Sequence, residues 1–414
     1  MRHLRVTLTP NLAITVIALM TLMLHMIFWH LPLLDLGALQ TSVQDENFSD
    51  QNFYLYAASA LCHASSWTSD DLYVTWSATG VVGYLAYGCE VFGTEYFYVI
   101  LNPILIVMSF GLVIVAGRTL GLKPRIPLLS LISIPYTLLT LSLPGKEIIS
   151  MAGTMSCVAG LMLLECSGKR ALGFLAIAAG IALIAVNRMH EAGAMALFVV
   201  LWLTGTIKSP ISMLVFFAAA SYFANGVLGF VGLDQKATSL TDEVLWSGSS
   251  EGKSVDLDGI SDLLRSDNFF LHALLGVLRV LAVLASPLSS LVTPATVSDF
   301  SYFIFRDLSQ RLRLIDLILI VYVIYLVAAS PKYHLPIAHR RLYALMPLLF
   351  LFMIYVISFF GISQKSRYIF QYTPLLLLWL WLFAPNQSPK ISTTEINCQS
   401  QPEILRSDET PYPS

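Results

Sequence analysis

Apolar runs separated by short polar turns fill most of this 414-residue sequence. Many of the runs are about 17 to 25 residues long, the length at which an α-helix crosses the hydrocarbon core of a bilayer. They cover about residues 11–34, 72–92, 96–117, 126–143, 148–166, 171–187, 191–207, 210–233, 269–292, 314–330, 342–363 and 368–384. The pattern predicts an all-α integral membrane protein, a multi-pass helical bundle of about 10–12 transmembrane helices with a large outer, periplasmic segment.

The same pattern predicts one polytopic membrane domain over residues 1–384. Its first run is too long for a signal peptide and lacks a small-residue cleavage pattern, so we interpret it as a first transmembrane helix. Residues 35–71 form a polar loop without Lys or Arg, and the positive-inside rule therefore places this loop outside. Residues 385–414 form a polar, Pro-rich tail that we expect to be disordered.

An alternating topology brings the basic turns inside if two of the runs do not cross. The run over 72–92 is rich in Gly, Ser, Thr and Tyr, and we predict a re-entrant or paired half-helix segment there. The run over 269–292 is interrupted by a His, an Arg and a Pro, and we predict that it lies along the interface. Residues 234–313 then form one large outer segment. The basic residues placed inside are Arg2, Arg5, Arg118, Lys123, Arg125, Lys169, Arg170, Lys208, Lys332, Arg340 and Arg341.

The composition agrees with a membrane protein, and the net charge bears on which partners the protein binds. The chain is 56% hydrophobic and 12% charged, whereas ordinary soluble proteins are about a quarter charged. A net charge of -2 argues against nucleic acid as a partner. The five cysteines show no metal-ligand spacing, and a disulfide between Cys62 and Cys89 is left open.

Ionisable side chains stand where two apolar runs meet, at Pro144-Gly145-Lys146-Glu147. Charges at this depth cost free energy unless they are paired, hydrated or used. We expect Pro144 to open the next helix, so that the free N–H groups of the helix and Lys146 form a site for a phosphate or diphosphate. The alternative is that Glu147 only complements the helix dipole and that Lys146 reaches the lipid headgroups.

A second charged turn contains Arg188, His190 and Glu191, between two short helices. The planar fork of an arginine binds two phosphate oxygens at once, and Glu191 is placed to orient Arg188 or to accept a proton. The alternative is that Arg188 caps one helix and that Glu191 favours the start of the next.

Two further groups lie on the predicted outer face. Lys365 and Arg367, followed by Tyr368, run against the positive-inside trend, which indicates either an anionic ligand or a headgroup anchor. Asp50 in the first outer loop is a candidate general base towards a sugar hydroxyl, and Tyr54 a candidate to stack on a sugar ring. The alternative is that Asp50, and the preceding pair Asp45 and Glu46, are acidic loop residues exposed to solvent without a catalytic role.

This arrangement resembles the bacterial O-antigen and capsular polysaccharide polymerases, and more loosely the multi-pass GT-C glycosyltransferases that use lipid-linked sugar donors. The resemblance covers about residues 45–375. The residues that carry it are Asp50-Gln51-Asn52-Phe53-Tyr54, Pro144-Gly145-Lys146-Glu147, Arg188, Leu278-Arg279 with Ser286-Pro287, and Arg367-Tyr368.

The resemblance implies an inner-membrane enzyme whose active site faces the periplasm. Such a polymerase transfers a growing glycan from undecaprenyl diphosphate to the non-reducing-end hydroxyl of an incoming lipid-linked repeat unit. It needs cations for the departing diphosphate and a carboxylate for the attacking hydroxyl. The catalytic candidates are Asp50, Lys146, Glu147, Arg188, Glu191 and Arg367, and the substrate-binding candidates are Tyr54, His190, Lys365 and Tyr368.

The implied partners are a polyprenyl-diphosphate-linked glycan, membrane lipid and a chain-length regulator protein, without nucleic acid. No cofactor and no metal ligand set is implied, although Asp45 and Glu46 close to the first helix leave metal dependence open.

Two other functions remain open at this point. An O-antigen ligase, or a transferase that uses a polyprenyl-linked monosaccharide, needs the same cations. A transporter or flippase of lipid-linked glycan is the alternative from another class. Internal repeats are not apparent, and the ionisable residues gather at helix ends on one face, which argues against a carrier.

Overall fold

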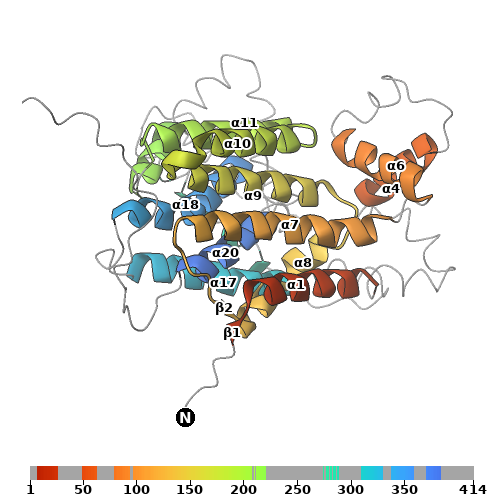
Figure 1. The fold of residues 1–414 in the computed structure, drawn as a ribbon, viewed down its shortest axis with the longest axis horizontal. Coiled ribbons are helices and arrows are strands. Elements are labelled where there is room, and N and C mark those ends of the chain that lie inside the picture. The colour runs from red at the N-terminus through yellow and green to blue at the C-terminus, as the bar shows by residue number, and fades with distance from the viewer. Residues whose placement is uncertain are drawn as a thin grey trace, which may run out of the picture.

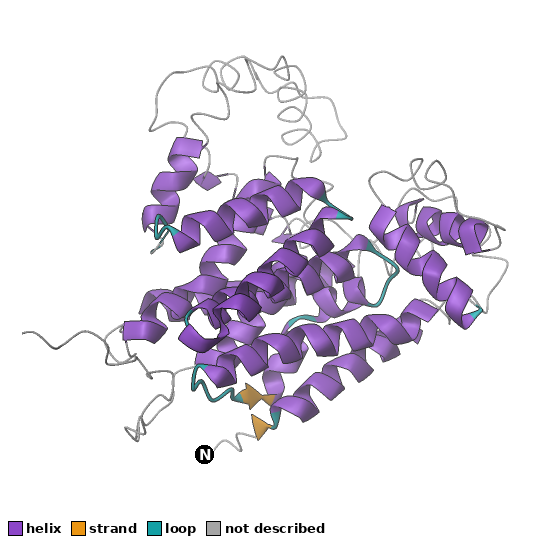
Figure 2. Ribbon diagram, turned by 45° about the horizontal axis from the view of Figure 1, so that its top comes forward, coloured by secondary structure: helices purple, strands orange, loops and turns teal. Residues whose placement is uncertain are grey.

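A computed structural model gives the fold, and it is mostly helical (Figure 2). It describes residues 7–26, 49–62, 79–93, 97–207, 209, 211–220, 309–329, 337–358 and 370–383, together with individual positions between 274 and 288. The predicted tail, the run over 269–292 and most of the outer segment 234–313 lie outside the described residues or are described only at isolated positions.

Eleven labelled helices form the body of the described structure (Figure 1). They are α1 (Pro10–His25), α4 (Ser49–Cys62), α6 (Thr79–Phe92), α7 (Tyr98–Thr119), α8 (Pro135–Leu141), α9 (Lys146–Leu164), α10 (Arg170–Ala185), α11 (Met189–Leu203), α17 (Ser309–Ala329), α18 (Ile337–Ser358) and α20 (Thr373–Phe383). Three 3-10 turns, η4 (Leu128–Ser133), η5 (Ser167–Lys169) and η9 (Phe370–Tyr372), and a short helical stretch Ile211–Ala220 join them. Strands β1 (Thr7–Leu8) and β2 (Ile126–Pro127) pair antiparallel.

The prediction of a helical protein is confirmed, and most of the apolar runs are helices. Among the described residues, α7 and α9 are long and apolar enough to cross a membrane by length and composition, and further apolar helices are shorter. The 14-residue helix α6 is about 21 Å long at 1.5 Å per residue, less than the roughly 30 Å of a bilayer core. The rest of the run 72–92 lies outside the described residues, so the re-entrant or half-helix segment there stays a prediction.

One prediction from the apolar pattern was wrong. The run 126–143 is no single helix, because Pro127 precedes η4 and Pro135 opens α8. Proline has no N–H to donate and keeps the preceding residue out of the α region, and Ile134 adopts φ -130° and ψ 45°. Within the polar segment 35–71, which is predicted to lie outside, residues Ser49–Cys62 form the helix α4.

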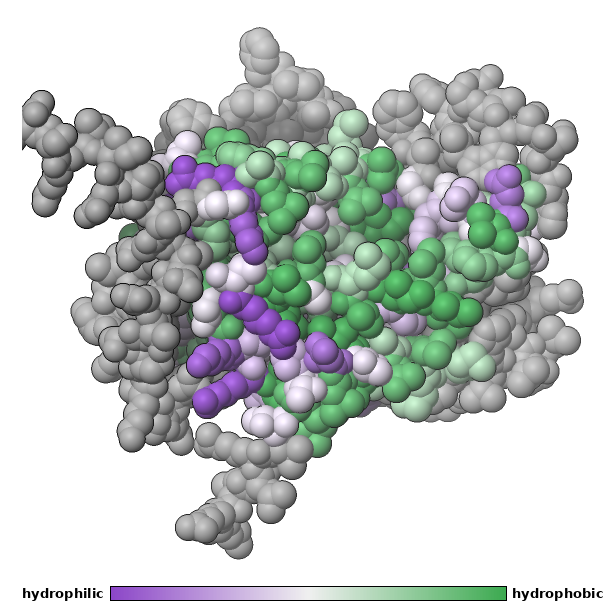
Figure 3. Space-filling model, viewed as in Figure 1, coloured by the Kyte–Doolittle hydropathy of each residue, from purple (hydrophilic) through white to green (hydrophobic). Residues whose placement is uncertain are grey.

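The bundle has two ends with different chemistry. Arg341, on α18, forms an ion pair of 3.8 Å with Glu165 after α9 and donates to the Trp202 carbonyl near the end of α11. The Arg125 N–H donates to the Trp381 carbonyl near the end of α20. These contacts gather basic residues that were predicted inside at one end. In Figure 3 hydrophilic residues collect towards the left of the view, and apolar residues cover most of the remaining coloured surface.

Helices α9 and α10 pack backbone to backbone through glycines. A Cβ added to Gly153 would lie 2.6 Å from the Gly180 carbonyl oxygen, and one on Gly160 would lie 2.6 Å from the Gly173 carbonyl oxygen. The Ser156 hydroxyl donates to the Ala176 carbonyl at 2.8 Å across the same contact. Because the blocking atoms belong to the backbone, they have little freedom to move aside.

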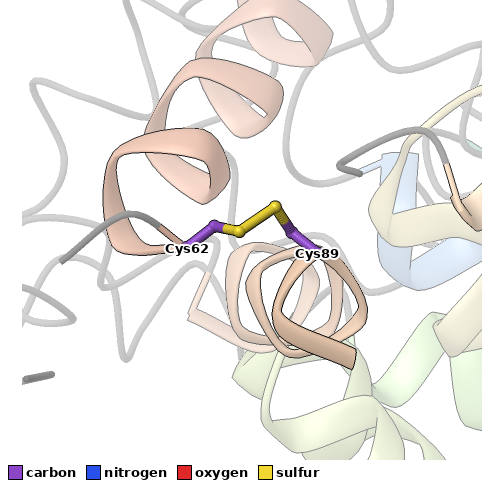
Figure 4. Close-up of a disulfide and its surroundings, with 2 residues drawn as sticks. All are labelled: Cys62 and Cys89. Carbon is purple, nitrogen blue, oxygen red and sulfur yellow. A yellow bond between two sulfur atoms is a disulfide. The ribbon is translucent and has the colours of Figure 1, made fainter. Parts of the chain in front are cut away.

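Helices α4 and α6 form a separate pair beside the bundle (Figure 1). A disulfide between Cys62 and Cys89, which the sequence left open, joins them with a Cα–Cα distance of 5.7 Å (Figure 4). The Gly80 N–H donates to the Val186 carbonyl at 3.0 Å, and the Tyr84 hydroxyl donates to Asn102 at 2.9 Å. The pair is therefore fastened to the end of the bundle at which α10 finishes and α7 begins.

We expect Gly160→Leu to lower the free energy of unfolding by about 1–3 kcal/mol or more, because the added side chain meets the backbone of α10. The melting temperature of the purified protein should fall accordingly. The matched change is Gly111→Leu on α7, where an added Cβ meets nothing within 4 Å. Equal melting temperatures for the two variants in the same detergent would contradict the close packing of α9 and α10.

Candidate functional site

Arg188 stands in the turn between α10 and α11 with its side chain inside the protein. Its N–H donates to the Ile184 carbonyl at 2.8 Å, and its carbonyl accepts from the Ala192 N–H at 3.0 Å, so its backbone closes one helix and opens the next. The side chain is 5% exposed. A guanidinium cannot lose its proton in a protein, and burying it requires partners of opposite charge.

Two carboxylates from different helices supply that charge. Arg188 Nη2 lies 2.9 Å from Glu147 Oε1 in the first turn of α9, and Nη1 lies 2.6 Å from Glu191 Oε1 in the first turn of α11. Nη1 also donates to the side-chain oxygen of Gln371 at 3.1 Å. With one guanidinium and two carboxylates, this buried group carries a formal charge of -1, and we call Glu147, Arg188, Glu191, Gln371 and Tyr372 the Arg188 cluster.

The 3-10 turn η9 completes the cluster from the far end of the chain. The Gln371 amide donates to Glu191 Oε2 at 3.2 Å, and the Tyr372 hydroxyl donates to the same oxygen at 2.7 Å. The Tyr372 side chain is buried, so its hydroxyl is committed to this hydrogen bond.

Lys146 lies beside the cluster and is only half buried. Its Nζ stands 5.4 Å from the ring centroid of Tyr54 on α4, within the range of a cation–π contact. The helix begins at Lys146 with Gly145 as its N-cap, so the expectation that Pro144 opens it was wrong by two residues. A Cβ added at Gly145 would meet Glu147 Oε2, so a side chain here would displace that carboxylate oxygen.

The surroundings of the cluster hold further polar groups. The Asn187 side chain is packed against Gly80, where an added Cβ would lie 2.6 Å from Asn187 Oδ1. Within the described residues, Asn187 Oδ1, Ser150 Oγ and Thr373 Oγ1 are buried without a hydrogen-bond partner. Each belongs to a residue next to the cluster or one helical turn from it. Buried polar atoms are usually satisfied, so this interior has hydrogen-bonding capacity to spare.

The structure brings five of the predicted residues together, namely Tyr54, Lys146, Glu147, Arg188 and Glu191. His190 lies exposed in the first turn of α11. Asp50 belongs to α4, one helical turn before Tyr54, but its side chain is outside the described part. Lys365, Arg367 and Tyr368 also lie outside the described residues, as do Asp45 and Glu46.

The state of Arg188 differs from the expected one. From the sequence, its guanidinium is expected to be a fork open to two phosphate oxygens. In the structure both terminal nitrogens already meet protein side chains, because Glu147 and Gln371 reach it from positions 41 and 183 residues away. Lys146, by contrast, retains partial exposure.

Sequence reasoning passed over Gln371 and Tyr372, which are uncharged and stand at the start of a strongly apolar helix. It also passed over Asp316 within the run 314–330. Asp316 is fully buried, and its Oδ2 accepts from the Thr137 hydroxyl at 2.7 Å and the Thr137 N–H at 3.3 Å. A carboxylate inside an apolar run was the signal that could have found it. This carboxylate satisfies the first turn of α8, which the break at Pro135 leaves without partners.

Within the described residues, no group of three or more His, Cys, Asp or Glu side chains is arranged to hold a metal ion. No protein-family model, no curated protein and no solved structure matches this chain. The functional assignment therefore depends on the residues and their geometry.

We expect Arg188→Met to destabilise the protein by about 3–5 kcal/mol, because two buried carboxylates lose their counter-charge. The matched substitution is Arg170→Met, at the exposed start of α10, which should change stability by less than about 0.5 kcal/mol. Thermal melting of the purified protein in one detergent compares the two. Similar melting temperatures would mean that the carboxylates do not depend on Arg188.

Proposed function

We propose that this chain is a multi-pass inner-membrane glycosyltransferase of the polysaccharide polymerase type. It joins repeat units linked to a polyprenyl diphosphate carrier at the outer face of the membrane. The observation that carries this proposal is the position of the half-buried Lys146 at the start of α9, directly beside Glu147 and the buried Arg188.

An apolar outer surface supports the membrane part of the proposal. Soluble monomers rarely expose contiguous apolar patches larger than about 300–600 Å². Here large apolar side chains are exposed along α7 at a spacing that keeps them on one face, and others are exposed along α10 and α17 (Figure 3). They include Ile100, Ile104, Met108 and Val115 on α7, Leu172, Phe174 and Leu175 on α10, and Ile318, Val321 and Tyr325 on α17.

Two observations support an outward-facing site. Basic residues collect at the end of the bundle opposite the Arg188 cluster, and the positive-inside rule assigns such an end to the cytoplasm. The disulfide between Cys62 and Cys89 fastens helices on the same side as the cluster, and disulfides persist in oxidising compartments such as the periplasm.

The residues of the cluster suit a transfer from a diphosphate leaving group. A helix N-terminus presents free N–H groups to an anion, and Lys146 adds a point charge beside those of α9. This chemistry involves neither hydride nor electron transfer, so we assign no cofactor. The partners proposed are the lipid-linked glycan, membrane lipid and a chain-length regulator.

We expect Lys146→Ala to abolish long surface glycan chains while single repeat units persist, because the leaving diphosphate loses its cation. The readout is a gel of surface glycan from native cells that lack this protein and carry wild type, Lys146→Ala or Lys169→Ala at equal expression. Lys169 is an exposed lysine at the opposite end of the bundle, and its replacement should leave chain length unchanged.

Other results of the same gel select the alternatives. Long chains that persist on the lipid carrier but never reach the cell surface would identify a ligase. Loss of all glycan from the outer face, including single units, would identify a flippase. Normal chain length with Lys146→Ala would reject a cationic site at the start of α9.

A further inference from the structure

The two carboxylates that flank Arg188 have different surroundings. Glu191 is 1% exposed, and both of its oxygens are occupied. Oε1 accepts from Arg188 at 2.6 Å, and Oε2 accepts from Gln371 at 3.2 Å and from Tyr372 at 2.7 Å. Because Glu191 is buried and both of its oxygens are hydrogen-bonded, a substrate hydroxyl does not reach it.

Glu147 has the opposite arrangement. Its side chain is 10% exposed, and among the described residues the structure gives it one hydrogen bond, from Arg188 to Oε1 at 2.9 Å. Oε2 lies over Gly145, where the missing side chain leaves room. Lys146, the neighbouring cation, is also partly exposed. The open oxygen thus lies beside the start of α9, where the diphosphate is proposed to bind.

We propose that Glu147 is the proton acceptor of the transfer, and that Gln371 and Tyr372 are positioning residues that act on it through Glu191 and Arg188. This inference rests on the proposed function. In the step, the sugar hydroxyl oxygen forms a bond to the anomeric carbon of the donor, and its proton passes to Glu147 Oε2. The bond from that carbon to the diphosphate oxygen breaks, and the polyprenyl diphosphate departs with the electron pair.

The geometry explains why so many groups hold one arginine. Arg188 has one terminal nitrogen on each carboxylate, so a rotation of the guanidinium would move Glu147. Gln371 contacts both Arg188 and Glu191, and the Tyr372 hydroxyl donates to Glu191. The turn η9 therefore sets the orientation of the guanidinium. This orientation acts on Glu147, in the first turn of α9, through a single hydrogen bond from Arg188. An error of about 1 Å in a catalytic group can lower turnover by about 10²-fold.

The test uses the full-length protein in vesicles of bacterial phospholipid. The probe is the single-repeat lipid-linked unit extracted from cells that lack this protein. We expect Glu147→Gln to lower kcat by about 10²–10⁴-fold with KM and melting temperature little changed, because the amide keeps the shape but takes no proton. Added formate should restore part of the turnover of Glu147→Ala. Glu165→Gln, at the other end of α9 and also beside an arginine, is the matched control and should retain wild-type kcat.

The positioning role has its own pair of variants. We expect Tyr372→Phe to lower kcat by up to about 10²-fold at unchanged KM. Tyr355→Phe removes a hydroxyl of similar burial, which donates to the Phe217 carbonyl at 2.8 Å away from the cluster, and should leave kcat unchanged. Equal effects of the two substitutions would overturn the positioning role. Normal kcat for Glu147→Gln, or no effect of formate on Glu147→Ala, would overturn the assignment of the proton acceptor.

Failure of this inference is distinguishable from failure of the proposed function. If the wild-type protein does not lengthen the probe, both the proposed function and this inference are wrong. If wild type is active and Glu147→Gln is equally active, the inference alone is wrong and the polymerase proposal stands.

Discussion

The buried guanidinium of Arg188 is the constraint on which the rest of this structure depends. Moving an ion of this kind from water into a protein interior costs several kcal/mol even after relaxation, so its partners must reach it with good geometry. Those partners come from the starts of α9 and α11 and from η9. One charge thereby ties together segments that are up to 183 residues apart in sequence.

The glycine contacts between α9 and α10 set the register that this charge requires. Gly153 lies opposite Gly180, and Gly160 lies opposite Gly173, so the two helices run antiparallel in one fixed alignment. Continuing that alignment to the end of α10 brings Glu147 level with the turn that holds Arg188. A side chain at any of these glycines would push the helices apart and lengthen the ion pair of 2.9 Å. Backbone packing in the middle of the bundle therefore determines the chemistry at its end.

The sequence predicted the helical class, most of the apolar helices and the charged turns, because hydrophobic periodicity and helix-end charges are local signals. It could not predict that Arg188 would be occupied, since Gln371 and Glu147 approach it only in the folded chain. Gln371 and Tyr372 escaped notice because uncharged polar residues at the start of an apolar helix are common. The run 126–143 was predicted as one helix because its hydrophobicity outweighed the prolines.

The small pairing of β1 with β2 bears on how the chain is assembled. Thr7 lies opposite Pro127 and Leu8 opposite Ile126, so the N-terminal strand has no partner until almost 120 further residues have left the ribosome. During that interval α1 and α7 are both synthesised, and the N-terminal strand becomes attached only when the chain returns after α7. The two-residue strands thus tie the N-terminus to the segment that follows α7, and every element up to β2 must be made before they can pair.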